Sequence, residues 1–248
     1  EFLPVLLGPR AMRPYRGYQA SIDPGISNVF ATAAYRVGHT LLSPQVLRLD
    51  AQGTHPLGSL PLADAFFAPD VFVATGLDPL LRGLAAQRAQ DVDPYVVDGV
   101  RNFLFGPPGA GGFDLVSLNI NRGRDHGLPS YADIRAMFGR PVTSFEDITR
   151  DGTLVGRLAA AYTNVEQVDA WVGLLSEDHA RGAMVGPTLR AILVDQFERL
   201  RDGDRFWYEA YLPPEVVEFV NSQRLSTIIR RNTSIGSELA DDVFHLRR

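Results

Sequence analysis

The chain of 248 residues contains no cysteine and no lysine. Without thiols it cannot form disulfides, zinc–thiolate sites, iron–sulfur clusters or a thiolate-ligated haem. All 24 cationic residues are arginines. The fork-shaped guanidinium favours contacts to carboxylates, but genome base composition is the better explanation of the bias. The net charge of −5 argues against nucleic acid or an anionic membrane surface as the main partner.

Long apolar runs are also missing. No stretch approaches the roughly 18 apolar residues that a membrane-spanning helix needs, so the sequence predicts no membrane span. The first residues, EFLP, lack the basic n-region of a signal peptide, and no methionine begins the chain. We therefore expect a processed chain or a piece of a longer protein.

The pattern of apolar residues predicts a single, mainly α-helical domain over residues 1–248, with long irregular loops and at most a short β-hairpin near 46–60. Asp23-Pro24 resembles a helix start, and a period near 3.6 predicts a helix from Ile26 to about Leu42. Residues 1–20 are expected to be irregular, and residues 106–112, rich in glycine and proline, are expected to form a loop. Further helices are expected near 62–75, 78–87, 93–105, 130–138, 144–149, 153–163, 165–173, 186–201, 204–209 and 213–223.

His39 stands out among the five histidines because it lies on this apolar helix, after Gly38, which leaves a flat face beside it. Arg36 lies one turn earlier on the same face. A haem group needs an imidazole for its iron and cations for its propionates, and this pair offers both. A lone histidine on a helix is otherwise more often an ordinary core or surface residue.

A second charged segment, LNINRGRDHGLP at residues 118–129, offers matching groups. An iron-ligating histidine needs a hydrogen-bond partner for its second ring nitrogen, and the amide oxygen of Asn119 can accept that bond. Arg122 can reach a second propionate. The alternatives are a turn or helix cap for Asn119 and a surface ion pair with Asp125 for Arg122.

These two segments, YRVGHTL at 35–41 and LNINRGRDHGLP at 118–129, resemble the signature segments of the animal-type haem peroxidases, in the peroxidase–cyclooxygenase superfamily. Further similar stretches are LDPLLRGL at 77–84, WVGLLSE at 171–177, VGP at 185–187 and LRDGDRFW at 200–207. The resemblance covers nearly the whole chain and implies the helical fold of that family.

The resemblance implies a role for each matching residue. His39 is the expected proximal ligand of the iron of haem b, Asn119 its hydrogen-bond partner, and Arg36 and Arg122 the propionate anchors. The expected proximal apolar wall consists of Leu104, Phe105, Leu115 and Leu118. The resemblance assigns His126 to the scaffold together with Arg124 and Asp125, rather than to catalysis.

In the family, the distal histidine and arginine, the acidic residues that can bond covalently to haem, and the calcium loop precede the matched stretch. We therefore expect this chain to be the proximal, C-terminal part of the peroxidase domain, with no catalytic residue of its own. The missing N-terminal part is then an expected partner. Calcium and any covalent haem link are expected outside the chain. By itself the chain is expected to bind haem weakly at most and to be inactive.

The implied function is an oxidoreductase that reduces hydrogen peroxide and oxidises halides or small organic donors, as in the response to oxidative stress. Secretion or export is suggested by the family alone. One alternative is a fatty-acid dioxygenase of the same superfamily, whose radical tyrosine lies three residues before the proximal histidine; here that position is Arg36, and Tyr35 lies about 100° away on a helix. Another is a peroxidase-like binding module that has lost haem.

Overall fold

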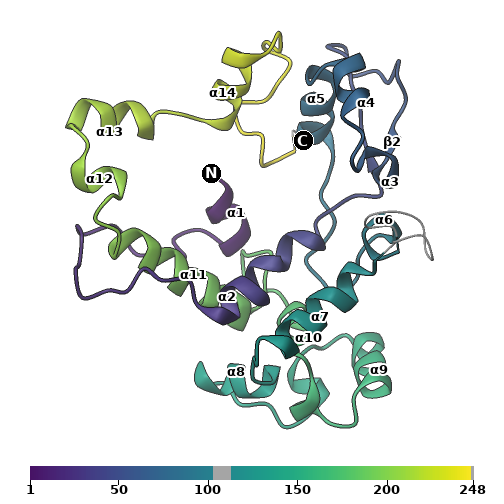
Figure 1. The fold of residues 1–248 in the computed structure, drawn as a ribbon, viewed down its shortest axis with the longest axis vertical. Coiled ribbons are helices and arrows are strands. Elements are labelled where there is room, and N and C mark those ends of the chain that lie inside the picture. The colour runs from purple at the N-terminus through teal and green to yellow at the C-terminus, as the bar shows by residue number, and fades with distance from the viewer. Residues whose placement is uncertain (103–112, 247–248) are drawn as a thin grey trace.

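The computed structural model describes residues 1–102 and 113–246, and in these ranges it is mainly α-helical, as predicted (Figure 1). The α-helices are α1 Phe2–Leu7, α2 Asn28–Thr32, α3 Leu62–Ala65, α4 Pro69–Thr75, α5 Asp78–Ala86, α6 Asp98–Arg101, α7 Leu115–Asp125, α8 Tyr131–Met137, α9 Gly152–Ala161, α10 Ala170–Ser176, α11 Pro187–Asp202, α12 Tyr208–Tyr211, α13 Pro214–Asn221 and α14 Leu225–Asn232. The 3₁₀ helices are η1 Ala34–His39, η2 Phe145–Asp147 and η3 Val165–Gln167. The strands β1 Gln45–Val46 and β2 Leu60–Pro61 pair antiparallel, as the predicted hairpin requires.

Helix α10 is the centre of the core. Six of its residues are buried, and it packs against α7, α8, α11 and η1. Around it lies a continuous apolar cluster that includes Trp171, Leu174, Leu189 and Leu193. The helices α12, α13 and α14 leave this core and run toward α5, near which the described chain ends (Figure 1). The two segments that carry the candidate site residues, η1 and α7, therefore both pack against α10.

The predicted helix from 26 to 42 is wrong as a single element. Asp23 does not cap a helix, because α2 begins only at Asn28; its carboxylate accepts a hydrogen bond from the Gly25 N–H in the turn before it. Helix α2 begins at Asn28 and ends at Thr32, whose buried hydroxyl donates to the Asn28 carbonyl at 2.6 Å. Such back-bonding by threonine disturbs a helix. Ala33 then leaves helical geometry (φ −130°, ψ −65°), and the chain continues as the 3₁₀ helix η1.

Pro69 explains why a second predicted helix is divided in two. The predicted helix 62–75 is split into α3 and α4, and Pro69 is the first residue of α4. A residue before proline is disfavoured in helical geometry, and Ala68 accordingly adopts φ −111° and ψ 62°. Helices α1, α7 and α14 were not predicted. The predicted helix 144–149 is the 3₁₀ helix η2, and the predicted helix 165–173 is divided into η3 and α10. The other predicted helices within the described ranges exist with shifted or shorter bounds.

The long helix α11 ties the N-terminal segment to the core. Glu198 is 6% exposed and accepts hydrogen bonds from the Arg13 backbone N–H and guanidinium at 2.5–2.8 Å. Arg201, on the next turn, donates to the Arg13 carbonyl at 2.6 Å. A buried carboxylate is stable only when it is paired in this way. These contacts give the irregular residues after α1 a fixed path.

The contact between α8 and α10 depends on a glycine, which yields a prediction. A Cβ atom on Gly173 would lie 2.1 Å from Cγ of the fully buried Tyr131 ring. We expect Gly173→Ala to lower the free energy of unfolding by about 1–3 kcal/mol or more through overpacking. Gly156→Ala is the matched control, because a Cβ there meets nothing within 4 Å; it should raise stability by about 0.5–1 kcal/mol. Chemical denaturation measures both, and equal stability of the two variants would contradict the packing described.

Candidate functional site

The 3₁₀ geometry of η1 places Arg36 and His39 on one face. Residues i and i+3 eclipse one another in a 3₁₀ helix, whereas in an α-helix they are offset. The element is held from behind by the buried side chains of Ala34 and Val37. The prediction that Arg36 and His39 share a face therefore stands, although the predicted α-helix does not.

Helix α7 supplies the second half of the site. Asp114 caps its N-terminus, because its carboxylate accepts hydrogen bonds from the backbone N–H groups of Val116 and Ser117. This start makes Asn119 an interior residue of the helix and excludes the alternative that it is a cap. Four predicted site residues then fall at helical spacing on one side of α7: Leu115, Leu118, Asn119 and Arg122.

One side-chain amide joins the two elements. Asn119 is only 1% exposed. Its Oδ1 accepts a hydrogen bond from Nη1 of Arg36 at 3.0 Å. Its Nδ2 lies 2.9 Å from Nδ1 of His39. A guanidinium can only donate, so the amide oxygen must face Arg36 and the amide nitrogen must face His39. The contact between Asn119 and His39 was predicted, but through the amide oxygen.

This orientation determines the protonation of His39. An amide N–H can bond only to an unprotonated Nδ1, so the neutral ring carries its proton on Nε2. Burial and the nearby positive charge of Arg36 both lower the pKa of His39 from its ordinary value. Both effects favour the neutral ring. No described residue forms a hydrogen bond with Nε2, which remains accessible to a ligand on the other side of the ring.

Two guanidinium groups lie together at the site without a carboxylate. Burial and the charge of Arg122 lower the pKa of Arg36. Nη1 of Arg122 lies 3.4 Å from the exposed ring of His126, and within the described ranges neither Arg36 nor Arg122 forms an ion pair. In contrast, the arginines that hold the scaffold lie 2.8–2.9 Å from carboxylates: Arg82, Arg124 and Arg230. The site consequently has an unbalanced positive charge that favours an anionic group.

The rest of the RGRDHG stretch positions α7. Arg124 donates two hydrogen bonds of 2.8 Å to Asp169, immediately before α10, and the Tyr162 hydroxyl also donates to Asp169. The backbone carbonyl of His126 accepts from the Asn28 amide at 2.8 Å and so connects α7 to α2. Sequence reasoning missed Asp169, Tyr162 and Asn28. Only Asp169 carries a local signal, as an aspartate just before a helix.

The apolar residues near the site differ in how exposed they are. Leu115 is half-buried and Leu118 is 39% exposed, so α7 presents apolar surface beside Asn119. Leu104 and Phe105 lie outside the described residues. A Cβ atom at Gly38 would meet nothing within 4 Å, which leaves open space next to His39. Tyr35 stacks on Phe30 with ring centroids 4.8 Å apart.

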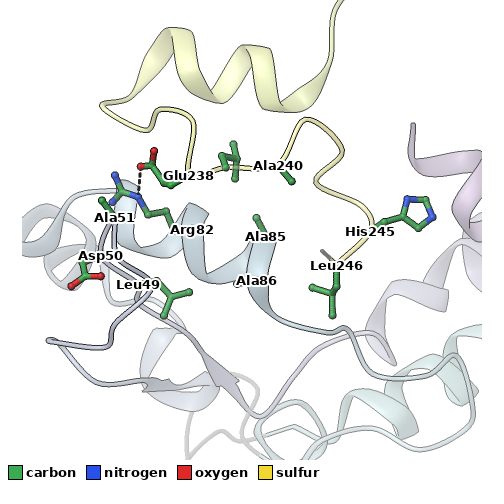
Figure 2. A pocket seen from close by; sticks show the side chains of 12 residues that line it. Leu49, Asp50, Ala51, Arg82, Ala85, Ala86, Glu238, Ala240, His245 and Leu246 are labelled. Carbon is green, nitrogen blue, oxygen red and sulfur yellow. Dashed lines mark hydrogen bonds and ion pairs between the residues drawn. The ribbon is translucent and has the colours of Figure 1, made fainter. Parts of the chain in front are cut away.

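A separate pocket of about 310 Å³ lies between α5 and the C-terminal segment (Figure 2). Arg82 on α5 and Glu238 on that segment face one another across it, with Nε and Oε1 2.9 Å apart. The lining contains none of the residues around His39. This pocket therefore belongs to the packing of the C-terminal segment and not to the candidate site.

Comparison with known proteins assigns the family. The animal haem peroxidase model matches residues 1–244, and the chain belongs to that family. Peroxinectin A of Dictyostelium discoideum is 40% identical over 245 residues, which are 98% of this chain and 45% of the relative. Human myeloperoxidase is 42% identical over 259 residues, covering 98% of this chain and 35% of the relative. The chain thus spans less than half the length of these relatives.

Solved structures agree with this assignment. Peroxidase A of D. discoideum superposes with a TM-score of 0.88 at 38% identity, over 100% of this chain and 46% of that one. A fatty acid alpha-dioxygenase of Arabidopsis thaliana superposes with a TM-score of 0.71 at 24% identity, over 85% of this chain and 36% of that one. The second likeness concerns the fold alone. The fold is the helical fold of the peroxidases, and membership of the family implies haem binding.

No helix in the described part of the chain has both the length and the apolar character needed to cross a membrane.

The amide bridge predicts the tautomer of His39. In ¹⁵N-labelled protein, long-range ¹H–¹⁵N NMR should show the His39 proton on Nε2. Arg36→Met removes both the donor to Asn119 and the positive charge, so the pKa of His39 should rise and the Nδ1–H tautomer should gain population. Arg122→Met is the control, because it removes a nearby charge and keeps the bridge. A wild-type ring protonated on Nδ1 would contradict the bridge as described.

Proposed function

We propose that this chain forms the proximal side of a haem b site in a peroxidase. In this proposal His39 is the axial ligand of the iron, and Asn119 is its hydrogen-bond partner. Arg36 and Arg122 hold the propionates, and Leu115 and Leu118, with Leu104 and Phe105, form the apolar wall. The observation that carries the proposal is the hydrogen-bonded series Arg36–Asn119–His39, which joins a neutral imidazole to a cation through a buried amide.

The residues fit a haem group in their donor set. Among the described residues no three histidines, aspartates or glutamates are grouped to hold a metal ion. A single histidine is sufficient for haem iron, because the porphyrin supplies the equatorial nitrogens. The accessible Nε2 of His39 and the open space beside Gly38 are compatible with a flat ligand. Arg36 and Arg122, which form no ion pair within residues 1–102 and 113–246, suit two carboxylates of that ligand.

Binding of haem iron at Nε2 would change the amide bridge. With Nε2 occupied, a neutral His39 ring would hold its proton on Nδ1. Asn119 would then have to turn its amide oxygen toward the ring, which is the direction expected from the sequence. Arg36 would lose its present acceptor and could bond a propionate instead.

For the whole protein we propose peroxide reduction coupled to the oxidation of halides or small organic donors. Bound haem supplies the redox chemistry, and the residues of this chain tune it through the axial imidazole and its hydrogen bond. Peroxinectin A, human myeloperoxidase and peroxidase A support the peroxidase class. Secretion or export, a calcium ion and a covalent link to haem outside this chain are further proposals that rest on the family.

The dioxygenase alternative has less support. The dioxygenase structures resemble this chain at 20–24% identity, which concerns the fold. Arg36 occupies the position three residues before His39. Tyr35 stacks on Phe30 and lies edge-on to Phe197 of α11, at a centroid distance of 6.0 Å. The Tyr35 ring therefore packs against Phe30 of α2 and Phe197 of α11 and not against the imidazole of His39.

The haem assignment is tested by titrating ferric haem into the full chain. Because the described site supplies groups for one face of haem, we expect weak binding, a histidine-ligated absorption spectrum and no peroxide turnover. His39→Ala should abolish that spectrum. His126→Ala is the matched control, since its backbone carbonyl and not its ring holds Asn28, and it should leave the spectrum unchanged.

Two results would contradict the assignment. One is the same histidine-ligated spectrum in His39→Ala as in the wild type. The other is the absence of any such spectrum in the wild type at haem concentrations up to the solubility limit. Circular dichroism of each variant establishes that the fold is intact before the titration is interpreted.

A further inference from the structure

The segment 208–232, which contains α12, α13 and α14 and is called the C-terminal arm below, stands apart from the core (Figure 1). It continues from the end of α11, and α13 lies well away from the helices that pack around α10. Among the residues that the structure describes, the apolar core cluster contains none from the arm. The arm therefore gains little from the burial of apolar surface that stabilises the rest of the chain.

Helix α13 has one apolar side, and that side is in solvent. Val216, Phe219 and Val220 lie together at helical spacing, and all three are exposed, Phe219 by 56%. They are called the arm face below. Glu218 and Asn221 lie on the opposite side of the helix, and no residue of α13 is buried. An amphipathic helix of a folded protein normally packs its apolar side against a neighbour.

Within the described ranges, the side-chain contacts of α13 come from the arm itself. The Tyr208 hydroxyl donates to Oδ1 of Asn221 at 2.6 Å, and the Gln223 amide donates to the Phe219 carbonyl at 2.8 Å. The Arg231 guanidinium lies 5.7 Å from the centre of the Phe219 ring. A helix of eight residues needs tertiary packing, because isolated helices shorter than about 12–15 residues are marginal in water. These contacts do not bury the arm face.

Polar contacts nevertheless hold the far end of the arm in place. The Glu1 carboxylate accepts a hydrogen bond from the Leu225 N–H at 2.8 Å, which fixes the start of α14 beside the N-terminus of the chain. The buried Ser226 hydroxyl donates to the Asp241 carbonyl at 2.7 Å. On the same helix Leu225 and Ile228, one turn apart, are exposed. The arm is thus attached at both ends while its apolar residues remain in solvent.

A longer relative indicates what covers the arm face. Peroxidase A superposes over 100% of this chain, so the match includes the arm, yet the matched part is only 46% of that protein. The arm therefore has a counterpart in a chain with a large further portion to pack against it. We propose that the arm face is an interface within the peroxidase domain. Apolar residues of the portion that the longer relatives contain, and that is absent from this sequence, cover Val216, Phe219 and Val220.

The inference rests on membership of the peroxidase family and on the exposure of the arm face, and not on haem ligation. The arm contains none of the candidate haem residues. The experiment below uses protein without haem, so its failure would leave the assignment of His39 untouched.

Co-expression of the full chain with a tagged portion of peroxinectin A tests the proposal. The tagged portion is the part of that relative that precedes the stretch matched by this chain. We expect it to retain this chain on an affinity column. Hydrogen–deuterium exchange of the α13 amides should be fast in the chain alone and slower by about tenfold or more in the complex. The amides of the buried helix α10 should be protected in both samples.

The double variant Val216→Ser/Phe219→Ser removes the apolar character of the arm face. The amount of chain retained should fall by about tenfold or more, because buried apolar anchors dominate such interfaces. Both side chains are exposed in the chain alone, so its melting temperature should not fall. The matched control is Val73→Ser/Met137→Ser, which changes two apolar residues that are exposed outside the arm. The control should be retained as the wild type is.

Three results would overturn the proposal. One is equal retention of the arm-face variant and its control, and another is failure of the tagged portion to retain the wild-type chain. The third concerns a different occupant and is measured by sedimentation of the chain alone. A dimer that the arm-face variant dissociates and the control does not would assign the arm face to a second copy of this chain.

Discussion

The buried amide of Asn119 constrains the whole candidate site. With the residue 1% exposed, both ends of the amide need partners from the protein, and one comes from Arg36 and the other from His39. This is possible only if η1 and α7 meet at one relative orientation. The end of α2 at Thr32, the Asp114 cap of α7 and the support of both elements by α10 establish that orientation. Arg124 and the His126 carbonyl then fix α7 to its neighbours.

The partners of the arginines distinguish those that stabilise the fold from those at the candidate site. Arginines with structural roles bond carboxylates: Arg13 with Glu198, and Arg124 with Asp169. Arg36 and Arg122 have no such partner among the described residues, and burial together with the charge of Arg122 lowers the pKa of Arg36. A folded protein keeps two such cations together when an anion offsets the cost.

Much of the fold could be predicted where local signals are strong. The predicted helix 186–201 matches α11 within a residue at each end, and the predicted hairpin near 46–60 exists as β1 and β2. The break at Ala33 could not be predicted from periodicity, because it depends on the Thr32 hydroxyl bonding back to Asn28 in a buried setting. Helix α14 was missed although it is amphipathic, since its sequence LSTIIRRN lacks a clear capping residue.

The sequence predicted which residues lie together at the site, but not which hydrogen bonds they form. Arg36 and His39 were expected on one face, and they share one, although in a 3₁₀ helix. Asn119 was expected against His39 and lies there. The direction of its amide follows from Arg36, a contact over 83 positions that only the folded chain reveals. Asp169 and Tyr162 likewise act through tertiary contacts that no spacing in the sequence indicates.

The central claim is that His39 of this chain ligates haem iron. Hyperfine spectroscopy of ferric haem bound to chain with ¹⁵N-labelled histidine measures it most directly, since only a nitrogen bonded to the iron is strongly coupled to it. We expect one strongly coupled histidine nitrogen in the wild type, absent from His39→Ala and present in His126→Ala. A coupled nitrogen that persists in His39→Ala would contradict the claim.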